Sequence, residues 1–468
     1  MLKKLLLFLL LVIIFSTNSR VSAQSTDGPI YIVQPGDTLS SIASRFNISI
    51  PELMDANGLS DPNLLSAGQE LIIPGLQGVS GVLVTETVQY GDSLRSLSRR
   101  TQVDTSMLQK LNRLVSPTEL YVGTSLILPQ QESAESLNIR ITPTAGESLF
   151  EMAVMNNTSP WRLVETNQLK GTWEALPGDV LYASGDSTET TTSGLPVVID
   201  KASIRPLPIK QGGTAVIRVQ VPDGVILKGK LADYPLNFFP DSDGSMVALQ
   251  GIHALLEPGI YPILLEATLP DGTNQSFEQM LVVISGNYPD DPVLYVDPET
   301  IDPAVTEPEQ QQLLSVVSQI TPQKFWDGQF ISPAITYAET SYFTSRYGSR
   351  RTYIGQGTEF TIYGFHTGLD YAGGTGLQIT APGAGKVVFQ APLTVRGNAT
   401  IIDHGWGVFS GFWHQSEFIA QIGEMVSTGQ VIGIVGGTGR VTGAHLHWEL
   451  WVNGVQVDPL DWLYDTYP

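Results

Sequence analysis

The sequence predicts a multidomain α+β chain, and three observations carry this prediction. A segment near the start is repeated three times, the middle alternates apolar and polar residues with period two, and the last part combines β-type runs with five of the six histidines. At 468 residues the chain is also too long for a single hydrophobic core. We therefore expect several small domains, each with its own core.

The first residues have the pattern of an export signal. Lys3 and Lys4 precede the apolar run 5–15, and the small residues Val21 and Ala23 follow it. This order predicts a signal peptide over residues 1–23, cleaved after Ala23. An uncleaved anchor is the alternative, although the apolar run is short for a membrane span. After cleavage we expect no membrane contact and a secreted or cell-envelope location.

Composition excludes several functions. The formal charge of −21 argues against a nucleic-acid partner, because such binding needs Lys and Arg to displace phosphate counterions. The chain has no cysteine, which excludes disulfides and thiol catalysis. Any bound metal must therefore be held by His, Asp and Glu. The oligomeric state is not predictable from the sequence.

The repeat has a fixed period. Gly36, Gly91 and Gly146 are each 55 residues apart (91 − 36 and 146 − 91). Two further sets keep the same interval, namely Asn57, Asn112 and Asn167, and Gly68, Gly123 and Gly178. Three landmarks in register across three copies indicate duplication.

Each copy has the order β-α-α-β. In the first, a strand near Ile30–Val33 leads to a turn where Asp37 or Thr38 caps a helix, and a second helix near 51–57 precedes a closing strand at 71–73. The copies cover residues 30–75, 85–130 and 139–185.

The copies resemble LysM modules. The resemblance rests on the Pro-Gly-Asp-Thr-Leu turn at 35–39, the Asn that ends the second helix, and the closing Gly-x-x-Leu-x-Ile-Pro segment. It implies binding to N-acetylglucosamine-containing glycans such as peptidoglycan, and weak modules in tandem gain effective concentration. The third copy diverges, because its closing segment reads Gly178-Asp-Val-Leu-Tyr182 and lacks the proline. We expect it to keep the fold, and whether it binds glycan is open. A spacer array without a ligand is the alternative for the set.

The middle of the chain contains a linker, a β domain and a second connection. Residues 186–194 are rich in Ser and Thr and predict a linker. Residues 195–286 predict an immunoglobulin-like β-sandwich, since positions 215, 217, 219 and 221 are apolar while Arg218 and Gln220 face the other way. Residues 287–329 predict a Pro- and Asp-rich linker followed by a helix near 310–320. His253 is isolated in the sandwich, and we assign it no role.

The last domain, residues 330–468, is mainly antiparallel β by pattern and carries the candidate site. If residues 444–450 form a strand, His445 and His447 lie on one face, and Leu446, Trp448 and Leu450 on the other. His366 and Asp370 add an imidazole and a carboxylate, and Gly368 between them argues against a regular helix. Two histidines and one carboxylate suit catalytic zinc and leave a fourth position for water.

The domain resembles the lysostaphin-type zinc endopeptidases of peptidase family M23. The matching segments are Phe365–Tyr371, the strand pair 398–414 and the closing motif 443–449. The resemblance implies one Zn²⁺ per catalytic domain, with His366, Asp370 and His447 as ligands and His414 and His445 as unliganded catalytic histidines. Which of the two histidines is the general base stays open. His404, in an Asp-His-Gly turn, is expected to hold local backbone.

Two departures from the family pattern stand near His414. Gln415 replaces the usual leucine, and Phe412 and Trp413 precede the histidine. We expect these changes to alter the wall of the cleft.

The sequence thus predicts an exported zinc metalloendopeptidase that binds peptidoglycan and cuts peptide bonds in stem peptides or cross-bridges. A catalytically inactive wall-binding regulator and a purely adhesive glycan-binding protein are the alternatives. The sequence does not reveal which bond is cut, the physiological role or any autoinhibition.

Overall fold

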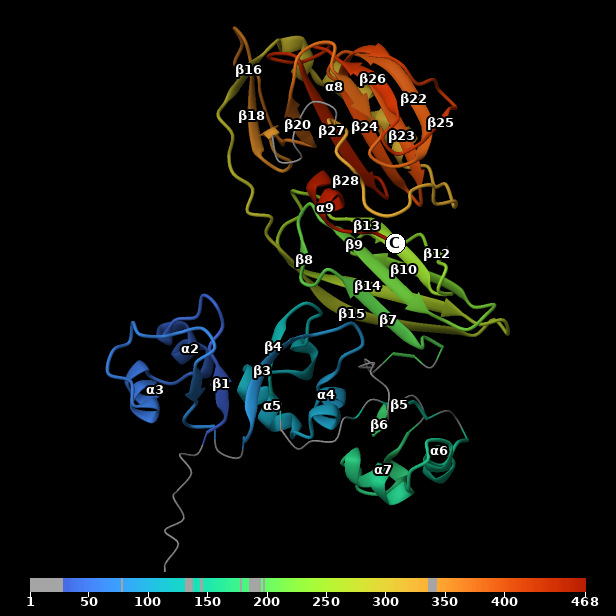
Figure 1. The fold of residues 1–468 in the computed structure, drawn as a ribbon. Helices are drawn as coiled ribbons and strands as arrows, with labels where there is room; N and C mark the ends of the chain where they lie inside the picture. Colours follow the sequence, from blue (N-terminus) through green and yellow to red (C-terminus); the bar gives the residue numbers. More distant parts are fainter. Residues whose placement is uncertain are drawn as a thin grey trace, which may run out of the picture. The chain divides into compact units, whose positions relative to one another are not determined.

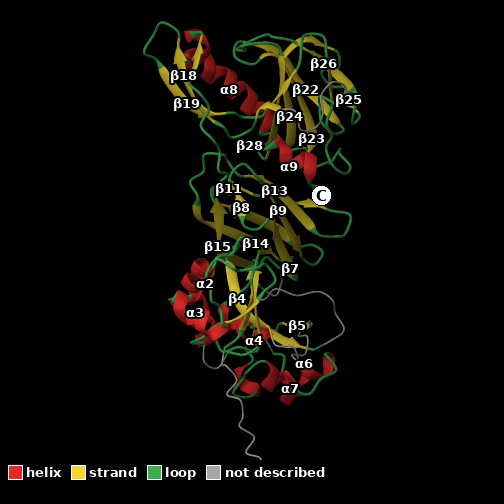
Figure 2. Cartoon of the chain, turned by 60° about the vertical axis from the view of Figure 1, so that its left-hand side comes forward, coloured by secondary structure: helices red, strands yellow, loops and turns green. Residues whose placement is uncertain are grey.

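The computed structural model describes residues 28–76, 79–130, 137, 139–143, 146–176, 179–184, 195–196, 198–335 and 343–468. The expected signal peptide (1–23) and Ser/Thr-rich linker (186–194) lie outside these residues. The chain divides into two compact units, one formed by 1–86, 97–117 and 126–137 and the other by 87–96, 118–125 and 138–468. Across the described ranges, none of the helices combines the length and apolar character needed to span a membrane. The fold is mostly β with short helices (Figures 1 and 2).

The first two copies of the repeat have the expected order of elements. The first consists of β1 (Ile30–Ile32), α2 (Leu39–Phe46), α3 (Ile50–Asn57) and β2 (Glu70–Ile72). The second consists of β3 (Val82–Thr87), α4 (Leu94–Thr101), α5 (Thr105–Asn112), η1 (Pro117–Glu119) and β4 (Ser125–Gln130). Their strands share one sheet in the order β2-β1-β3-β4, and β1 runs parallel to β3.

The repeated asparagine fastens the second helix to the closing strand. The amide nitrogen of Asn57 donates to the carbonyls of Leu53 and Ile72 at 2.8 Å each, and its oxygen accepts from the Ile72 amide at 2.6 Å. Asn112 makes the same three bonds 55 residues later. The interval seen in the sequence therefore corresponds to a repeated set of three hydrogen bonds, which we call the asparagine clasp.

The third copy has the same arrangement on a smaller scale. Its elements are β5 (Ile139–Ile141), α6 (Leu149–Met155), α7 (Pro160–Thr166), η2 (Thr172–Glu174) and β6 (Leu181–Ala183). β5 and β6 pair antiparallel, and buried Asn167 repeats the clasp with the backbone of Tyr182. The element order of the repeat is thus present in all three copies.

The middle β region forms two sheets around one core. One sheet has the order β11-β10-β14-β15-β8 and the other β12-β13-β9-β7. As the alternation predicted, Ala215, Ile217 and Val219 of β9 are buried between them. The strands are β7 (Lys201–Arg205), β8 (Ile209–Lys210), β9 (Thr214–Gln220), β10 (Ile226–Leu231), β11 (Tyr234–Pro235), β12 (Phe239–Pro240), β13 (Met246–Gly251), β14 (Gly259–Thr268) and β15 (Asn274–Ile284).

The C-terminal region is built on a large, mainly antiparallel sheet with the central order β17-β20-β27-β24-β23-β22-β25. Its elements are β17 (Phe343–Ser345), β20 (Leu369–Ala372), β21 (Gln378–Thr380), β22 (Gly385–Leu393), β23 (Gly397–Gly405), β24 (Val408–Phe418), β25 (Met425–Val426), β26 (Val431–Val435), β27 (His445–Val452), β28 (Val455–Val457) and α9 (Pro459–Tyr464). A smaller sheet joins β16 (Leu294–Val296), β18 (Arg350–Gly355) and β19 (Thr361–Phe365).

The two faces of β27 lead to different cores. Leu446, Trp448 and Leu450 are fully buried in the larger core, which also takes in residues of the β12-β13-β9-β7 sheet. Trp451, on the opposite face, packs with Trp413 in a second core. The face that carries His445 and His447 is therefore itself partly covered by other elements.

The segment 287–329 differs in detail from the expected linker and helix. It contains β16, η3 (Pro298–Ile301) and α8, which begins earlier than predicted and spans Pro303–Val317. Leu313 and Val317 of α8 are buried in the same core as Trp413. The helix therefore covers the sheet face that carries the candidate site (Figures 1 and 2).

Candidate metal centre

Strand register brings the distant site residues together. β20 pairs antiparallel with β27 so that Asp370 lies directly opposite His447, and Ala372 lies opposite His445. Directly opposed residues project from the same face of a sheet, so the carboxylate and the imidazole meet. Gly368 permits this close approach, since a Cβ there would lie 2.2 Å from the carbonyl oxygen of Trp448.

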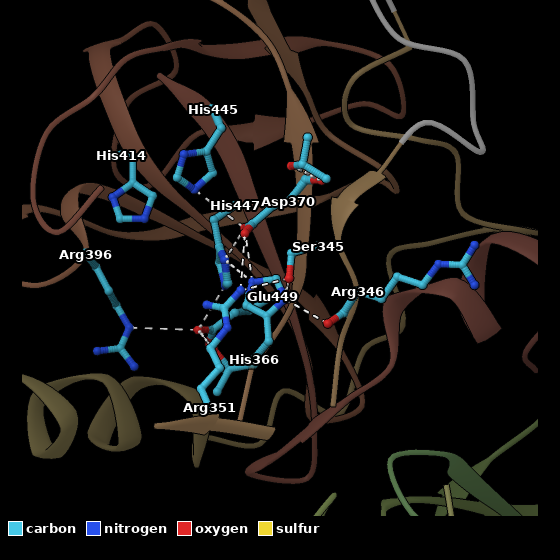
Figure 3. A network of polar contacts seen from close by, with 12 residues as sticks. Ser345, Arg346, Arg351, His366, Asp370, Arg396, His414, His445, His447 and Glu449 are labelled. Carbon is cyan, nitrogen blue, oxygen red and sulfur yellow. Dashed lines mark hydrogen bonds and ion pairs between the residues drawn. The ribbon is translucent and has the colours of Figure 1, made fainter. Parts of the chain in front are cut away.

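Three predicted ligands converge on one point. The Nε2 atom of His366 lies 3.1 Å from Oδ1 of Asp370 and 3.0 Å from Nδ1 of His447, and that Nδ1 lies 2.7 Å from the same Oδ1 (Figure 3). Tetrahedral zinc with bonds of about 2.0–2.1 Å places neighbouring donors roughly 3.3 Å apart. The three donor atoms need to move apart only slightly to bind the ion.

The surrounding hydrogen bonds point the lone pairs inward. Nδ1 of His366 lies 2.9 Å from the carbonyl oxygen of Arg346, which can only accept, so His366 keeps an unprotonated Nε2 toward the centre. Nε2 of His447 lies 3.4 Å from Oε1 of Glu449, which favours a free Nδ1 in the neutral ring. Such outer partners fix the tautomer of metal-ligating histidines. The donor set therefore fits a zinc ion.

The carboxylates at the centre stay ionised despite burial. Burial alone would raise the pKa of Asp370, but the charges and hydrogen bonds of His366 and His447 outweigh it and hold that pKa well below its usual range. Burial opposes ionisation of Glu449 as well, and the hydrogen bond from His447 and the charge of Arg396 lower its pKa to about 2. The centre is a negative site lined by imidazoles, which attracts a cation.

His414 and His445, the predicted catalytic pair, lie beside this centre. Their ring centroids are 5.0 Å apart, and Nε2 of His445 lies 3.6 Å from Oδ1 of Asp370 (Figure 3). Nδ1 of His414 donates to the carbonyl of Thr438, and Nδ1 of His445 to that of Gly443, both at 2.8 Å. In the neutral rings each Nε2 is left free to accept a proton.

His414 is held in an unusual backbone conformation and a dry environment. Its φ of 63° lies in the left-handed region, and its amide donates to the carbonyl of Arg396 at 2.9 Å. Burial, assisted by the neighbouring His447 and His445, lowers its pKa to about 3. The ring is therefore neutral at physiological pH.

The two remaining histidines are not among the converging ligands. His404 is fully buried, with Nδ1 2.8 Å from the carbonyl of Ala384 and Nε2 2.9 Å from Oγ of Ser410, and burial lowers its pKa to about 4. These bonds agree with the backbone-holding role expected for it. His253 packs edge-on against Phe365 with ring centroids 5.2 Å apart.

The expectation that the departures near His414 reshape the cleft wall is wrong. Phe412 and Gln415 are fully buried, and the Gln415 amide donates to Oγ1 of Thr400 and the carbonyl of Phe412. Trp413 is buried in the core under α8, with its ring 5.6 Å from the guanidinium of Arg396. All three point into packed regions because β24 is a central strand with elements on both faces.

Several residues around the centre were not assigned from the sequence. Nη2 of Arg351 lies 3.7 Å from Oδ2 of Asp370 and donates to Oγ of Ser345. Glu449 stands two residues after His447, so alternation along β27 could have placed it on the ligand face. The segment Thr344–Arg351 resembles the family's lead-in to the first ligand, but the contact of Arg351 with Asp370 depends on how its strand in the smaller sheet packs.

Comparisons with known proteins identify two kinds of domain. Residues 364–459 match peptidase family M23, and residues 31–74 and 87–129 match the LysM domain. These matches confirm the resemblance to peptidase family M23 and the LysM resemblance of the first two copies.

Similar proteins include named endopeptidases. The chain is 43% identical over 95 residues to the DD-carboxypeptidase/endopeptidase Mpg of Neisseria meningitidis serogroup B (20% of this chain, 22% of that protein). It is 40% identical over 94 residues to the peptidoglycan DD-endopeptidase ShyC of Vibrio cholerae, with the same shares covered. A solved structure of a putative peptidase M23 from Pseudomonas aeruginosa is 26% identical, with 55% of this chain and 94% of that chain covered and a TM-score of 0.41. The chain spans about a fifth of the length of these curated relatives.

Proposed function

We propose that this chain, which contains a peptidase family M23 domain and two LysM domains, is an exported zinc metalloendopeptidase of the cell envelope that hydrolyses peptide bonds in peptidoglycan. The observation that carries the proposal is the convergence of His366, Asp370 and His447, whose ligand atoms all lie within 4.8 Å of one another. All three residues fall inside the segment that matches the peptidase family.

Each group at the centre has a chemical task. Zinc bound by the three donors would supply the Lewis acidity that polarises a carbonyl and acidifies water. His414 and His445 present free Nε2 atoms beside the ligands, so one can accept a proton while the other donates to the oxyanion or leaving amine. Glu449 and the carbonyl of Arg346 keep the ligand rings oriented.

The repeats would hold the enzyme on its substrate. We assign residues 30–75 and 85–130 to LysM modules that bind glycan, residues 139–185 to a divergent third module, and residues 195–286 to an immunoglobulin-like sandwich. The common β-α-α-β order and the Asn167 clasp support the third module. Modules in tandem raise the local concentration of the peptidase domain, residues 330–468, at the wall.

The direct test uses intact sacculi. The purified chain should release muropeptides with newly exposed peptide termini, and a chelator should stop the release until zinc is restored. Absent or chelator-insensitive release would contradict the enzyme assignment and favour a wall-binding regulator. Deleting residues 30–185 should weaken sacculus binding while cleavage of a small soluble peptide continues.

A further inference from the structure

Guanidinium groups gather beside the metal centre of a chain whose formal charge is −21. Arg351 reaches Asp370 at 3.7 Å, and its Nη1 lies 3.5 Å from the hydroxyl of Tyr353 on the same strand. The guanidinium of Arg440 stacks on that tyrosine ring, 4.5 Å from its centroid. Arg396 also lies near the centre, 4.0 Å from Glu449.

Carboxylates match the charge of Arg351 and Arg396. Nε of Arg351 lies 3.1 Å from Asp291, in addition to the contact with Asp370. Nη1 of Arg396 lies 2.9 Å from buried Glu309 of α8. Both guanidinium groups are therefore already paired with carboxylates of the protein and are not available to a ligand.

Arg440 differs from these two. Its side chain donates one hydrogen bond, from Nη1 to the carbonyl of Thr300 at 3.0 Å, and within the described part of the chain no carboxylate lies within ion-pair distance of it. A guanidinium has five N–H donors. Burial, with the like charges of Arg396 and Arg351, lowers the pKa of Arg440, while Tyr353 and Glu309 act in the opposite direction.

The loop that carries Arg440 also accepts a hydrogen bond from each of the two catalytic histidine candidates. Thr438, two residues before Arg440, accepts from His414, and Gly443, three residues after it, accepts from His445. The Arg440 amide itself donates to the carbonyl of Val395 at 2.8 Å. A half-buried cation is thus fixed on the segment that borders the reacting groups.

We propose that Arg440 is a specificity residue that binds a carboxylate of the substrate peptide near the bond to be cut. The inference rests on the proposed function and narrows its substrate class to acidic peptides. Arg pairs with carboxylate through two parallel hydrogen bonds, and stacking on Tyr353 holds the planar group ready for that geometry. The carboxylate can belong to a side chain or to a chain terminus.

The test compares peptides that differ in one charge. Three cross-linked peptide dimers are needed: one with all carboxyls free, one with the side-chain carboxyl amidated and one with the terminal carboxyl amidated. The zinc-loaded full chain should lose about tenfold to a hundredfold in kcat/KM on one of the two amidations, which identifies the bound group. Arg440→Gln should lose a similar factor in kcat/KM on the dimer with free carboxyls. Its kcat/KM should no longer change when the bound carboxyl is amidated.

Matched variants separate recognition from loop structure. Arg440→Lys should retain part of the preference, because it keeps the charge without the planar fork. Arg350→Gln removes the same charge from an exposed position on β18 and should behave as the parent chain. If Arg440→Gln lowered kcat/KM equally on all three dimers, the residue would have a structural role and the inference would be overturned. An unchanged kcat/KM would overturn it as well.

Binding measurements keep this inference distinct from the proposed function. If the parent chain cleaves none of the dimers, the peptidase assignment fails, and titration of the same dimers by calorimetry still tests Arg440. Tighter binding of the free dimer that disappears in Arg440→Gln supports the carboxylate site. Equal affinity for free and amidated dimers overturns it even if cleavage is observed.

Discussion

Glu309 of α8 forms a buried ion pair with Arg396, with 2.9 Å between Oε1 and Nη1. The same carboxylate accepts from the backbone amides of Val395 and Arg396. The carbonyl of Arg396 in turn accepts from the amide of His414. A helix outside the segment that matches the peptidase family therefore supports the backbone of a catalytic histidine candidate.

The first prediction concerns this support. Glu309→Ala removes the carboxylate nearest to a buried guanidinium and the acceptor of two amides, so we expect a loss of about 3 kcal/mol in the stability of the peptidase domain. Peptidase activity should fall further than stability alone explains, because His414 loses its backbone anchor. Denaturant unfolding and kcat/KM at a temperature where the variant stays folded measure the two effects. Glu307→Ala, on an exposed turn of the same helix, is the control and should change neither.

The second prediction separates the metal ligands from the catalytic pair. His366→Ala and Asp370→Ala should each abolish bound zinc, because only two donors remain, and turnover should be lost with the metal. His445→Ala should keep close to one zinc per chain and lose turnover. Metal analysis of the purified variants decides between these outcomes. His253→Ala removes a histidine that is not among the converging donors and should retain its zinc; a variant at 445 that lost its zinc would contradict the division of roles.

The third prediction concerns the asparagine clasp. Asn112→Ala leaves the amide and carbonyl of Ile127 without their partners, which costs about 1–3 kcal/mol in local stability. Amide hydrogen exchange should therefore accelerate in β4, while the strands of the peptidase sheet keep their protection. Asn112→Asp keeps the oxygen that accepts from Ile127 but sets a second acceptor against the carbonyls of Leu108 and Ile127, so it should not restore the protection. Equal exchange in all three proteins would show that the clasp does not stabilise the module.

The fourth prediction is a pH dependence of stability. Asp458 caps α9 by accepting from the Leu460 amide at 3.0 Å, and burial, with the charge of Asp461, raises its pKa to about 7. The folded state then binds the proton more tightly than the unfolded chain does. The stability associated with that proton is fully present below pH 3.8 and is lost as the pH rises through about 7.

Asp458→Asn tests this dependence, because asparagine keeps the cap and cannot ionise. The variant should be more stable than the parent at pH 8, on the order of 1–3 kcal/mol, and nearly equal to it at pH 4. Denaturant unfolding across this range provides the measurement. Asp465→Asn, at the exposed end of the same helix, is the matched control, and a difference between Asp458→Asn and the parent that did not grow with pH would count against the raised pKa.

The candidate site was largely predictable from the sequence because its residues follow local rules. Alternation along 445–449 fixes which side chains share a face, and the absence of cysteine restricts the metal donors to His, Asp and Glu. The side chains of Phe412, Trp413 and Gln415 were misplaced. A short motif does not reveal that a strand is central and covered on both faces.

By itself, the sequence determined the repeat period and the β-type core of the middle region, and its resemblance to the peptidase family implied which three donors would hold a metal. Only the tertiary structure decided that Asp370 stands opposite His447, that Glu309 reaches Arg396 and that Arg440 lacks a carboxylate partner in the described residues. The reason is physical. Periodicity and turn chemistry act over a few residues, whereas register and charge pairing join segments tens of residues apart and depend on how whole sheets and helices pack.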